Sequence, residues 1–282
     1  MKYALLALSM GAAVTKNMVS RAGKAAFGSG RGMLRANMAT AALGLVVFAV
    51  SGLNFSFFSA DILLLAALYG LLTLLSQTLH IIAVRTGPVS VCSLIYASGF
   101  LIPTIFSTIA YGEPFSLGRG LGVALLLLSI VLVSAPSASH NGKMWLLPAF
   151  GAMAATGGVG VLQKLFRAAH PEAGMNEFLF AAFGAMLLIS LALYPAFRES
   201  SERVKGAPLM TLILAAAMVT VNKLNLYLSG ALPGAVFFPC INGGNMALTA
   251  VAAAIVFKEK LKPSQIAGVV GAAAAIVLIA VL

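Results

Sequence analysis

Residues 109–134 read IAYGEPFSLGRGLGVALLLLSIVLVS, and residues 255–280 read IVFKEKLKPSQIAGVVGAAAAIVLIA. A shift of 146 positions brings the two stretches into register, so that a glutamate, a short turn and a long apolar run follow in the same order. The same shift relates the breaks and apolar runs of the rest of the chain. Internal repetition in a strongly apolar chain is typical of membrane proteins built from two structural repeats. The sequence therefore predicts two related halves, residues 1–138 and residues 139–282.

The composition excludes a water-soluble globular protein. The chain is 61% hydrophobic and 9% charged, whereas soluble domains carry about 25% charged residues. A helix that spans a bilayer needs about 20 largely apolar residues, and glycines, prolines and charges divide this chain into ten such runs. We expect spanning helices near residues 3–22, 32–52, 61–83, 88–110, 117–135, 144–165, 175–197, 207–229, 233–256 and 263–282.

The number of runs predicts how the chain crosses the membrane. With ten spans, both termini lie on the same side, and with five spans in each half, the two halves enter the membrane in opposite directions. A β-barrel is disfavoured, because the runs are continuous and rich in leucine and alanine rather than alternating. The predicted fold class is an all-α membrane protein with ten transmembrane helices in two inverted five-helix repeats.

The sequence gives no indication of a cofactor or a metal. Cys92 and Cys240 lie inside apolar runs, which favours small core residues over a disulfide or a metal site. Nothing resembles a phosphate-binding loop, a zinc-ligand spacing or a nucleic-acid module, and loops that face anionic lipid explain the net charge of +11. We therefore expect no cofactor, no metal and no nucleic acid. The expected partners are the lipid bilayer and a small-molecule solute.

Basic residues are unevenly divided between the two sides of the membrane. The connections after the first, third, fifth, seventh and ninth runs hold twelve lysines and arginines, and the opposite side holds four. Because basic loops favour the cytoplasmic side, this bias predicts that both termini lie outside the cytoplasm. Lys164 and Arg167 belong to the smaller group, and we interpret them as anchors of a helix end at the membrane interface.

Several local features resemble one known family. A glutamate-bearing turn precedes the last glycine-rich run of each half, YGEP at 111–114 and FKEK at 257–260. Lys16 lies late in the first run, and Gly87-Pro88 opens the fourth. With ten predicted helices in two halves, the chain resembles the drug/metabolite transporter superfamily, and more narrowly its EamA-domain members. The resemblance covers the full length and rests on loose patterns.

The resemblance implies a secondary transporter rather than an enzyme. Such a protein moves small organic metabolites, for example amino acids or organic anions, by alternating access, commonly as an exporter in a bacterial inner membrane. Members usually have both termini in the cytoplasm, which is opposite to the orientation that the charges predict. The solute, the coupling proton or ion, the direction of flux and the choice between monomer and homodimer stay open.

Helix-breaking residues at matched positions of the two halves point to a binding site near the bilayer midplane. The stretch PCINGGN at 239–245 combines a proline and two glycines with Asn242 and Asn245, whose amides donate and accept hydrogen bonds. The matching stretch of the first half, residues 93–99, contains Tyr96. Close helix packing through small residues is the alternative interpretation. We predict that Tyr96, Asn242 and Asn245 contact the solute.

A polar stripe follows one face of the third predicted helix. Polar residues recur three and four positions apart from Thr73 through Gln77 to His80. The 146-residue shift places Gln77 on Lys223 of the eighth run, directly after Asn222. Polar groups are costly in lipid, so we expect Gln77, His80, Asn222 and Lys223 to line a cavity. Interhelical hydrogen bonds that hold the bundle together are the alternative.

Lys16 and Lys223 are the charges that lie deepest within predicted runs. A lysine at the centre of a spanning helix costs about 3 kcal/mol, although a long side chain near a helix end can reach the interface. No aspartate or glutamate falls in the middle of a predicted run. The cavity should therefore prefer a neutral, zwitterionic or anionic solute, with Lys16 or Lys223 meeting a carboxylate or phosphate.

The glutamates of the two matched turns have a structural interpretation. Glu113 and Glu259 each lie just before a predicted helix start, with Ser116 and Ser264 as N-cap residues. We expect both glutamates to hold the corner of a helical hairpin rather than to take part in transport chemistry.

Two other classes of function compete with a carrier. A channel or a non-transporting scaffold is the first, although paired interrupted helices and a polar stripe fit alternating access better than a static pore. A membrane-embedded hydrolase is the second, with Ser98 as nucleophile and His80 as base. The hydrolase is disfavoured because a full-length duplication gives such an enzyme nothing that it needs.

Overall fold

The computed structural model describes residues 1–87, 89–133, 144–171, 174–197, 206–258 and 262–281. This part of the chain is helical and contains no strand. Glu259, predicted to hold a hairpin corner, and the boundary expected at residues 138 and 139 lie outside it. The all-α fold class is confirmed for the described residues.

Each of the ten apolar runs predicted from the sequence lies on helix. The α-helices are α1 (Lys2–Ala22), α2 (Lys24–Phe27), α3 (Gly30–Val50), α4 (Ala60–Thr86), α5 (Val89–Ala97), α6 (Leu101–Tyr111), α7 (Leu117–Val133), α8 (Leu146–Ala169), α9 (Met175–Leu193), α10 (Ala207–Ala231), α11 (Gly234–Val256) and α12 (Pro263–Val281). Three 3₁₀ turns accompany them: η1 (Phe55–Phe57), η2 (Ser98–Phe100) and η3 (Tyr194–Ala196).

Eight helical segments of the described chain are long and apolar enough to cross a membrane. One of them, Val91–Tyr111, combines α5, η2 and α6. α7 is a shorter apolar helix of 17 residues, and α1 is 21 residues long but less apolar, because Lys16 and Asn17 interrupt it. A chain of this kind is compatible with a multi-pass membrane protein, because a helix satisfies its own backbone hydrogen bonds in lipid.

Local residues explain several helix boundaries. The side chain of Ser29 accepts a hydrogen bond from the N–H of Gly32 at 3.0 Å and so caps α3. Ser116 accepts from the N–H of Arg119 at 3.2 Å, which confirms it as the predicted cap of α7. Ser264 is different: it lies inside α12, and the N-cap prediction for it is wrong, because Pro263 is compatible with the first helical turn and starts the helix earlier.

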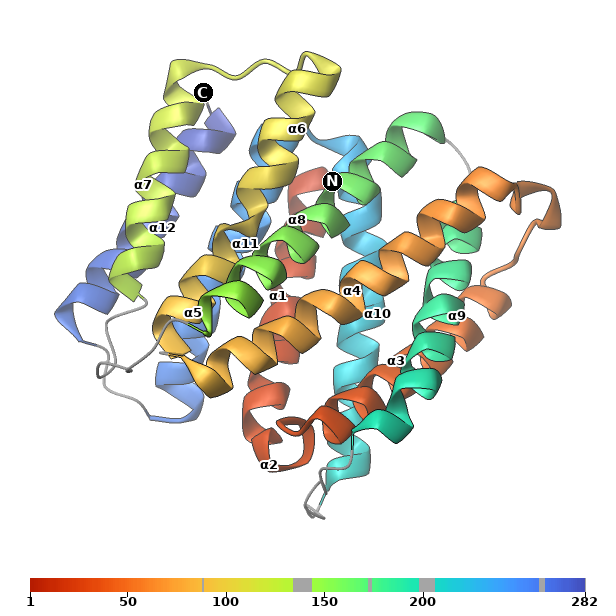
Figure 1. Ribbon diagram of the computed structural model, residues 1–282. Helices are drawn as coiled ribbons and strands as arrows, with labels where there is room; N and C mark the ends of the chain where they lie inside the picture. Colours follow the sequence, from red (N-terminus) through yellow and green to blue (C-terminus); the bar gives the residue numbers. More distant parts are fainter. Residues whose placement is uncertain (88, 134–143, 172–173, 198–205, 259–261, 282) are drawn as a thin grey trace.

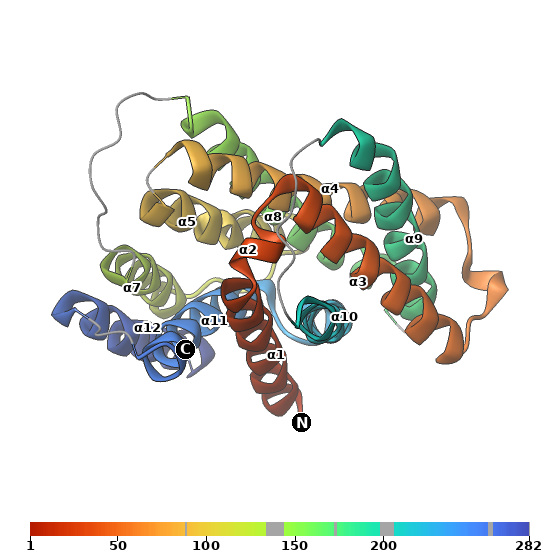
Figure 2. The ribbon, with the colours of Figure 1, turned by 90° about the horizontal axis from the view of Figure 1, so that it is seen from below.

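The helices form one bundle with the two chain ends at the same end of it (Figure 1). α1 runs from the N-terminus down to α2, so we call the two ends of the bundle the termini end and the α2 end. α7 packs against α12 on one side, and α3 packs against α9 on the other. α1 and α10 lie between these pairs, which is visible in the view from below (Figure 2).

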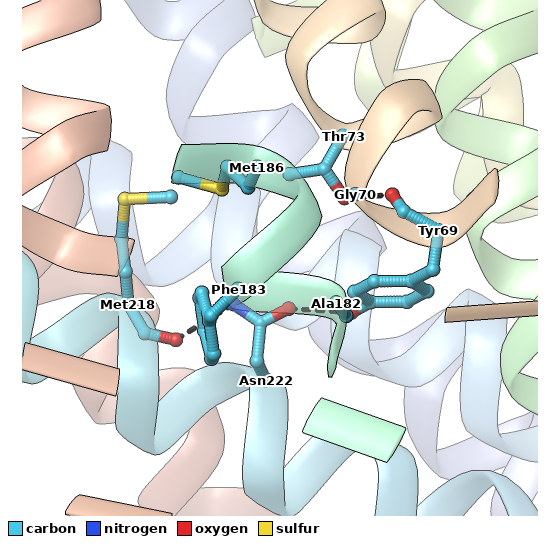
Figure 3. Close-up of a pocket in the computed structure, with 8 residues that line it drawn as sticks. All are labelled: Tyr69, Gly70, Thr73, Ala182, Phe183, Met186, Met218 and Asn222. Carbon is cyan, nitrogen blue, oxygen red and sulfur yellow. Dashed lines mark hydrogen bonds between the residues drawn. The ribbon is translucent and has the colours of Figure 1, made fainter. Parts of the chain in front are cut away.

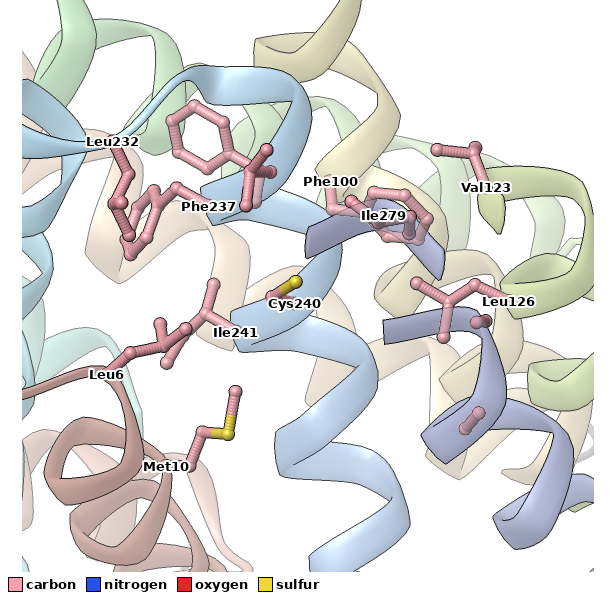
Figure 4. Packing of buried hydrophobic residues seen from close by; sticks show 14 of the residues in the cluster. Leu6, Met10, Phe100, Val123, Leu126, Leu232, Phe237, Cys240, Ile241 and Ile279 are labelled. Atoms are coloured by element: carbon pink, nitrogen blue, oxygen red, sulfur yellow. The ribbon is translucent and has the colours of Figure 1, made fainter. Parts of the chain in front are cut away.

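Two apolar clusters hold the bundle together. One joins α7, α11 and α12 through Leu126, Phe237 and Ile279, all at most 1% exposed (Figure 4). The other joins α4, α8 and α9, and within it the rings of Phe166 and Phe178 stack with their centroids 4.2 Å apart. The polar side chains of the interior lie partly on helices of these clusters, α4, α8 and α11, and partly on α1, α5 and α10, and these helices position the site.

Candidate functional site

Lys16, Gln77, His80 and Tyr96 form a polar group nearer to the α2 end of the bundle. They come from α1, α4 and α5. The rings of His80 and Tyr96 lie at an angle of 34° with their centroids 4.3 Å apart. Lys16 lies close enough to His80 for its charge to act on the imidazole. Gln77 lies three residues before His80, so both are on the same face of α4. The structure therefore places His80 against Tyr96, with Gln77 on the same face of α4 and Lys16 nearby on α1.

Several hydrogen-bonding groups of this region have no protein partner. Nδ1 of His80 is buried and has no hydrogen bond. In the described part of the chain, neither the ammonium of Lys16 nor the amide of Gln77 forms a hydrogen bond or an ion pair. Buried polar groups are nearly always paired in proteins, and an unpaired one such as Nδ1 of His80 costs about 1–3 kcal/mol; Lys16 and Gln77 are only partly buried. These groups can bind a polar or anionic solute without first breaking a contact within the protein.

Asn245 contacts Asn17 of α1, the residue next to Lys16. Its Oδ1 accepts a hydrogen bond from Nδ2 of Asn17 at 3.1 Å, and Asn17 also donates to Oγ1 of Thr249 at 3.0 Å. Asn17 follows Lys16 directly in the sequence. These hydrogen bonds connect α1 to α11 at the residue next to Lys16. Sequence reasoning missed Asn17, although its position next to Lys16 inside an apolar run was a visible signal.

The interruption predicted in residues 239–245 does not break the helix. α11 runs unbroken past Pro239 to Val256, and Asn242 donates from Nδ2 to the backbone oxygen of Phe238 at 2.9 Å, on its own helix. The matched stretch of the first half does change conformation, because η2 replaces α-helix at Ser98–Phe100. The expected break in α11 is therefore corrected, because the helix continues through the stretch. Pro239 still lacks the N–H that would pair with the backbone oxygen of Ala235, four residues earlier.

Asn222 lies in a second polar region, between α4, α8 and α10. The hydroxyl of Tyr69 donates to Oδ1 of Asn222 and accepts from Nε2 of Gln163 at 3.1 Å. Asn222 in turn donates to the backbone oxygen of Met218 at 2.8 Å. A small pocket of about 10 Å³, little more than room for one water molecule, lies beside this chain of bonds (Figure 3). Its lining also includes Thr73, the first residue of the predicted stripe.

Tyr69 and Gln163 are further residues that sequence reasoning missed. Tyr69 lies four positions before Thr73, and thus on the same face of α4 as the predicted stripe. Extending the stripe by one turn would have included it. Gln163 is 5% exposed and gives no periodic signal in its own run.

Lys223 points away from the His80 group. Its ammonium donates to Oδ1 of Asn176, the second residue of α9, and lies 5.6 Å from the centroid of the Phe48 ring. Asn176 follows the α8–α9 connection, so this contact is directed to the termini end. His80 lies six residues from the other end of α4. The sequence prediction placed both lysines at one cavity, but the structure separates Lys16 from Lys223.

Lys164 is a buried partner of Glu113 rather than an interface anchor. The two side chains form an ion pair and are 9% and 16% exposed. Lys164 also donates to the backbone oxygens of Ser229 and Leu232 at 3.1 and 3.3 Å. The anchor interpretation is corrected for Lys164, because the α6–α7 turn folds over it and brings a carboxylate. Arg167 does lie at the helix end, where it donates to the backbone oxygens of the following turn.

Comparisons with known proteins show a similar fold in a solved structure and do not identify an activity. No family model matches the sequence, and no curated protein matches it. The chain is similar to a solved structure described as "Crystal structure of protein", with a TM-score of 0.75 and 13% sequence identity. The match covers 99% of this chain and 98% of that one. The arrangement of helices is thus one that a crystallised protein also adopts along nearly its whole length.

Proposed function

We propose that this chain is a secondary transporter of small organic metabolites, such as amino acids or organic anions. It works by alternating access. It lies in a cell membrane, the inner membrane of a bacterium, and exports its solute. We assign it on its sequence resemblance to the drug/metabolite transporter superfamily and to the EamA-domain members within it. The polar group of Lys16, Gln77, His80 and Tyr96, in which Lys16, Gln77 and Nδ1 of His80 form no hydrogen bond within the described residues, is the observation that carries this proposal.

Helix packing supports two inverted halves of five spans each. The first half comprises α1, α3, α4, the α5–α6 pair and α7, and their counterparts in order are α8, α9, α10, α11 and α12. Exchanging each helix for its counterpart turns the contact of α1 with α10 into that of α8 with α4, and the contact of α4 with α9 into that of α10 with α3. Both members of each exchange are present. The pairs α3–α9, α6–α11 and α7–α12 map onto themselves, as a two-fold relation requires.

The polar group has the chemistry of a site for a carboxylate-bearing or other polar solute. When protonated, Lys16 provides a positive charge and three donors, and Gln77, His80 and Tyr96 provide polar groups of mixed donor and acceptor character. Within the described residues no carboxylate pairs with Lys16, so its ammonium gains most from an anion that arrives from outside, because charge-assisted hydrogen bonds are the stronger ones. A solute that bears a carboxylate provides this anion while it is bound and takes its charge with it when it is released.

Counterflow in proteoliposomes tests the proposal. Vesicles that hold the purified chain and an excess of one unlabelled amino acid or organic acid should accumulate the same labelled solute, whereas a simple pore should only equilibrate it. Candidate solutes are first ranked by the thermal stabilisation that each gives the protein, because a ligand of the native state stabilises it by mass action. A full panel without stabilisation or counterflow would refute the carrier.

Lys16→Met identifies the site within the same assay. We expect at least a tenfold loss of counterflow for a carboxylated solute, because the variant keeps an apolar side chain of similar length and removes the charge. Lys2→Met is the matched control, since Lys2 only donates to the backbone oxygen of Ala231 at the termini end. Counterflow of Lys16→Met at the wild-type rate would exclude Lys16 from the site.

A further inference from the structure

At the termini end of the bundle, one carboxylate and one ammonium form an ion pair between the two predicted halves. Glu113 belongs to the α6–α7 turn of the first half, and Lys164 belongs to α8 of the second. Besides its ion pair with Lys164, Glu113 accepts a hydrogen bond from the N–H of Gly234, the first residue of α11. The pair thus joins the α6–α7 turn to the start of α11 and to α8.

Lys164 also connects these three elements to the end of α10. It donates to the backbone oxygens of Ser229 and Leu232, where α10 ends and the chain turns into α11. Carbonyl groups at a helix C-terminus have no partner within the helix, so the ammonium satisfies groups that the termini end would otherwise leave unpaired. Both side chains are largely buried, and removing one partner of a buried pair leaves the other charge uncompensated.

Directly beneath the pair, α6 and α11 pack with no space between them. A Cβ built on Gly234 would lie 2.2 Å from Oγ of Ser107, and Ser107 itself is fully buried. α11 contacts α6 and η2, whereas α5, which carries Tyr96, packs on α4 and α8. The two halves therefore meet closely at the level of Ser107, between the polar group of Lys16 and the termini end.

We infer that the Glu113–Lys164 pair is the contact that closes the termini end, and that it must separate before the interior opens there. This inference rests on the proposed alternating access. A single ion pair is suited to closing and releasing this end. It holds the two halves together while it is intact, and both charges become solvated when it separates. The exposed pair of Asp61 and His170 at the same end, with side chains 60% and 24% exposed, is expected to add little.

A buried reporter thiol measures opening without any solute. Ser107→Cys is introduced in a chain that carries Cys92→Ser and Cys240→Ala, which remove the two natural thiols. The rate at which a small, charged methanethiosulfonate modifies the reporter is then measured on the full-length protein in detergent micelles. Ser129→Cys serves as a second reporter, because Ser129 is equally buried in the α7–α12 pair, away from the proposed closing contact.

Glu113→Gln should raise the modification rate of the Ser107→Cys reporter at least tenfold and leave that of Ser129→Cys unchanged. The amide keeps an oxygen for the N–H of Gly234 but removes the charge. Lys164→Gln should act in the same direction and replaces Glu113→Gln as the test if that variant fails to fold. Asp61→Asn, the matched control, should change the rate less than twofold.

Three results would overturn the inference: an unchanged rate in both charge-removing variants, an equal rise at both reporters, or an equal rise in Asp61→Asn. The carrier proposal fails independently of these outcomes. Absent counterflow with faster modification would remove the transport function and keep the closing contact. Counterflow with unchanged modification would keep the carrier and place the closure elsewhere.

Discussion

Tyr69→Phe removes one hydroxyl from the interior and leaves its ring in place. That hydroxyl donates to Oδ1 of Asn222 on α10 and accepts from Nε2 of Gln163 on α8 at 3.1 Å. The ring contacts Phe178 edge to face with centroids 5.4 Å apart, and phenylalanine can keep this contact. The variant therefore isolates two interhelical hydrogen bonds from the packing around them.

The expected cost follows from the number of bonds and their surroundings. Interhelical hydrogen bonds in a membrane protein contribute about 0.6 kcal/mol on average and about 1.7 kcal/mol at most. Two of them give about 1–3 kcal/mol. We expect a value in the upper half of this range, because Gln163 is only 5% exposed and its amide has little access to a replacement partner.

Reversible unfolding in mixed micelles, driven by a denaturing detergent and followed by helical circular dichroism, measures this free energy. Thr78→Val is the matched control, because Thr78 donates only to the backbone oxygen of Leu74 on its own helix, and it should change stability by less than about 0.5 kcal/mol. Asn222→Ala completes a double-mutant cycle with Tyr69→Phe. The two costs should fall short of additivity by about 0.5–1.5 kcal/mol.

Two results would refute this reasoning. If Tyr69→Phe unfolds within about 0.3 kcal/mol of the wild type, the hydroxyl is not a structural link between α4, α8 and α10. If the costs of Tyr69→Phe and Asn222→Ala add fully, the two side chains do not interact, since independent sites add within about 0.3–0.5 kcal/mol.

Two further variants test other parts of the bundle. Lys223→Ala removes the hydrogen bond to Asn176 that links α10 to α9 outside the Lys16 group, and should lower the rate of counterflow while membrane insertion, measured by flotation with liposomes, is unchanged; transport at the wild-type rate would remove Lys223 from the transport pathway. Gly70→Ala should destabilise the protein by about 1–3 kcal/mol in the same unfolding assay, because its Cβ would lie 2.6 Å from the backbone oxygen of Ala182. Gly11→Ala is its control, since nothing lies within 4 Å of the added atom, and it should be neutral or stabilising by up to about 1 kcal/mol; equal losses at both glycines would argue against the close α4–α9 contact.

The positions of the helices were predictable because each apolar run must pair its own backbone groups in lipid. The run near residues 61–83 lies on Ala60–Thr86, and the run near 207–229 lies on Ala207–Ala231. The short helix α2 was not predicted, since four residues give no periodic signal. Composition also failed to show that α11 stays helical at Pro239, because that outcome depends on the packing of the buried residues around the proline, among them Val236, Phe237 and Cys240.

For the candidate site, the sequence predicted which residues share a face of one helix but not which helices bring other residues to that face. The spacing of Gln77 and His80 correctly put both on one face of α4, because that relation is fixed by 3.6 residues per turn. The partners of that face depend on the packing of α1 and α5. The 146-residue shift suggested that Lys223 is equivalent to Gln77, but in a pair of inverted halves equivalent positions lie at opposite depths. The contact of Lys223 with Asn176 at the termini end fits that relation.

Lys164 shows why the depth of a charge along its own helix does not determine its surroundings. It lies six residues from the start of the α8–α9 connection, a position from which a lysine could reach the headgroups. The α6–α7 turn, which is more than 45 residues away in the sequence, instead covers it with Glu113. Lys16 lies six residues from the end of α1, and no turn within the described residues brings it a carboxylate. The two lysines lie at similar distances from the ends of their own helices but differ in what covers them, and that difference separates the proposed closing contact from the proposed solute site.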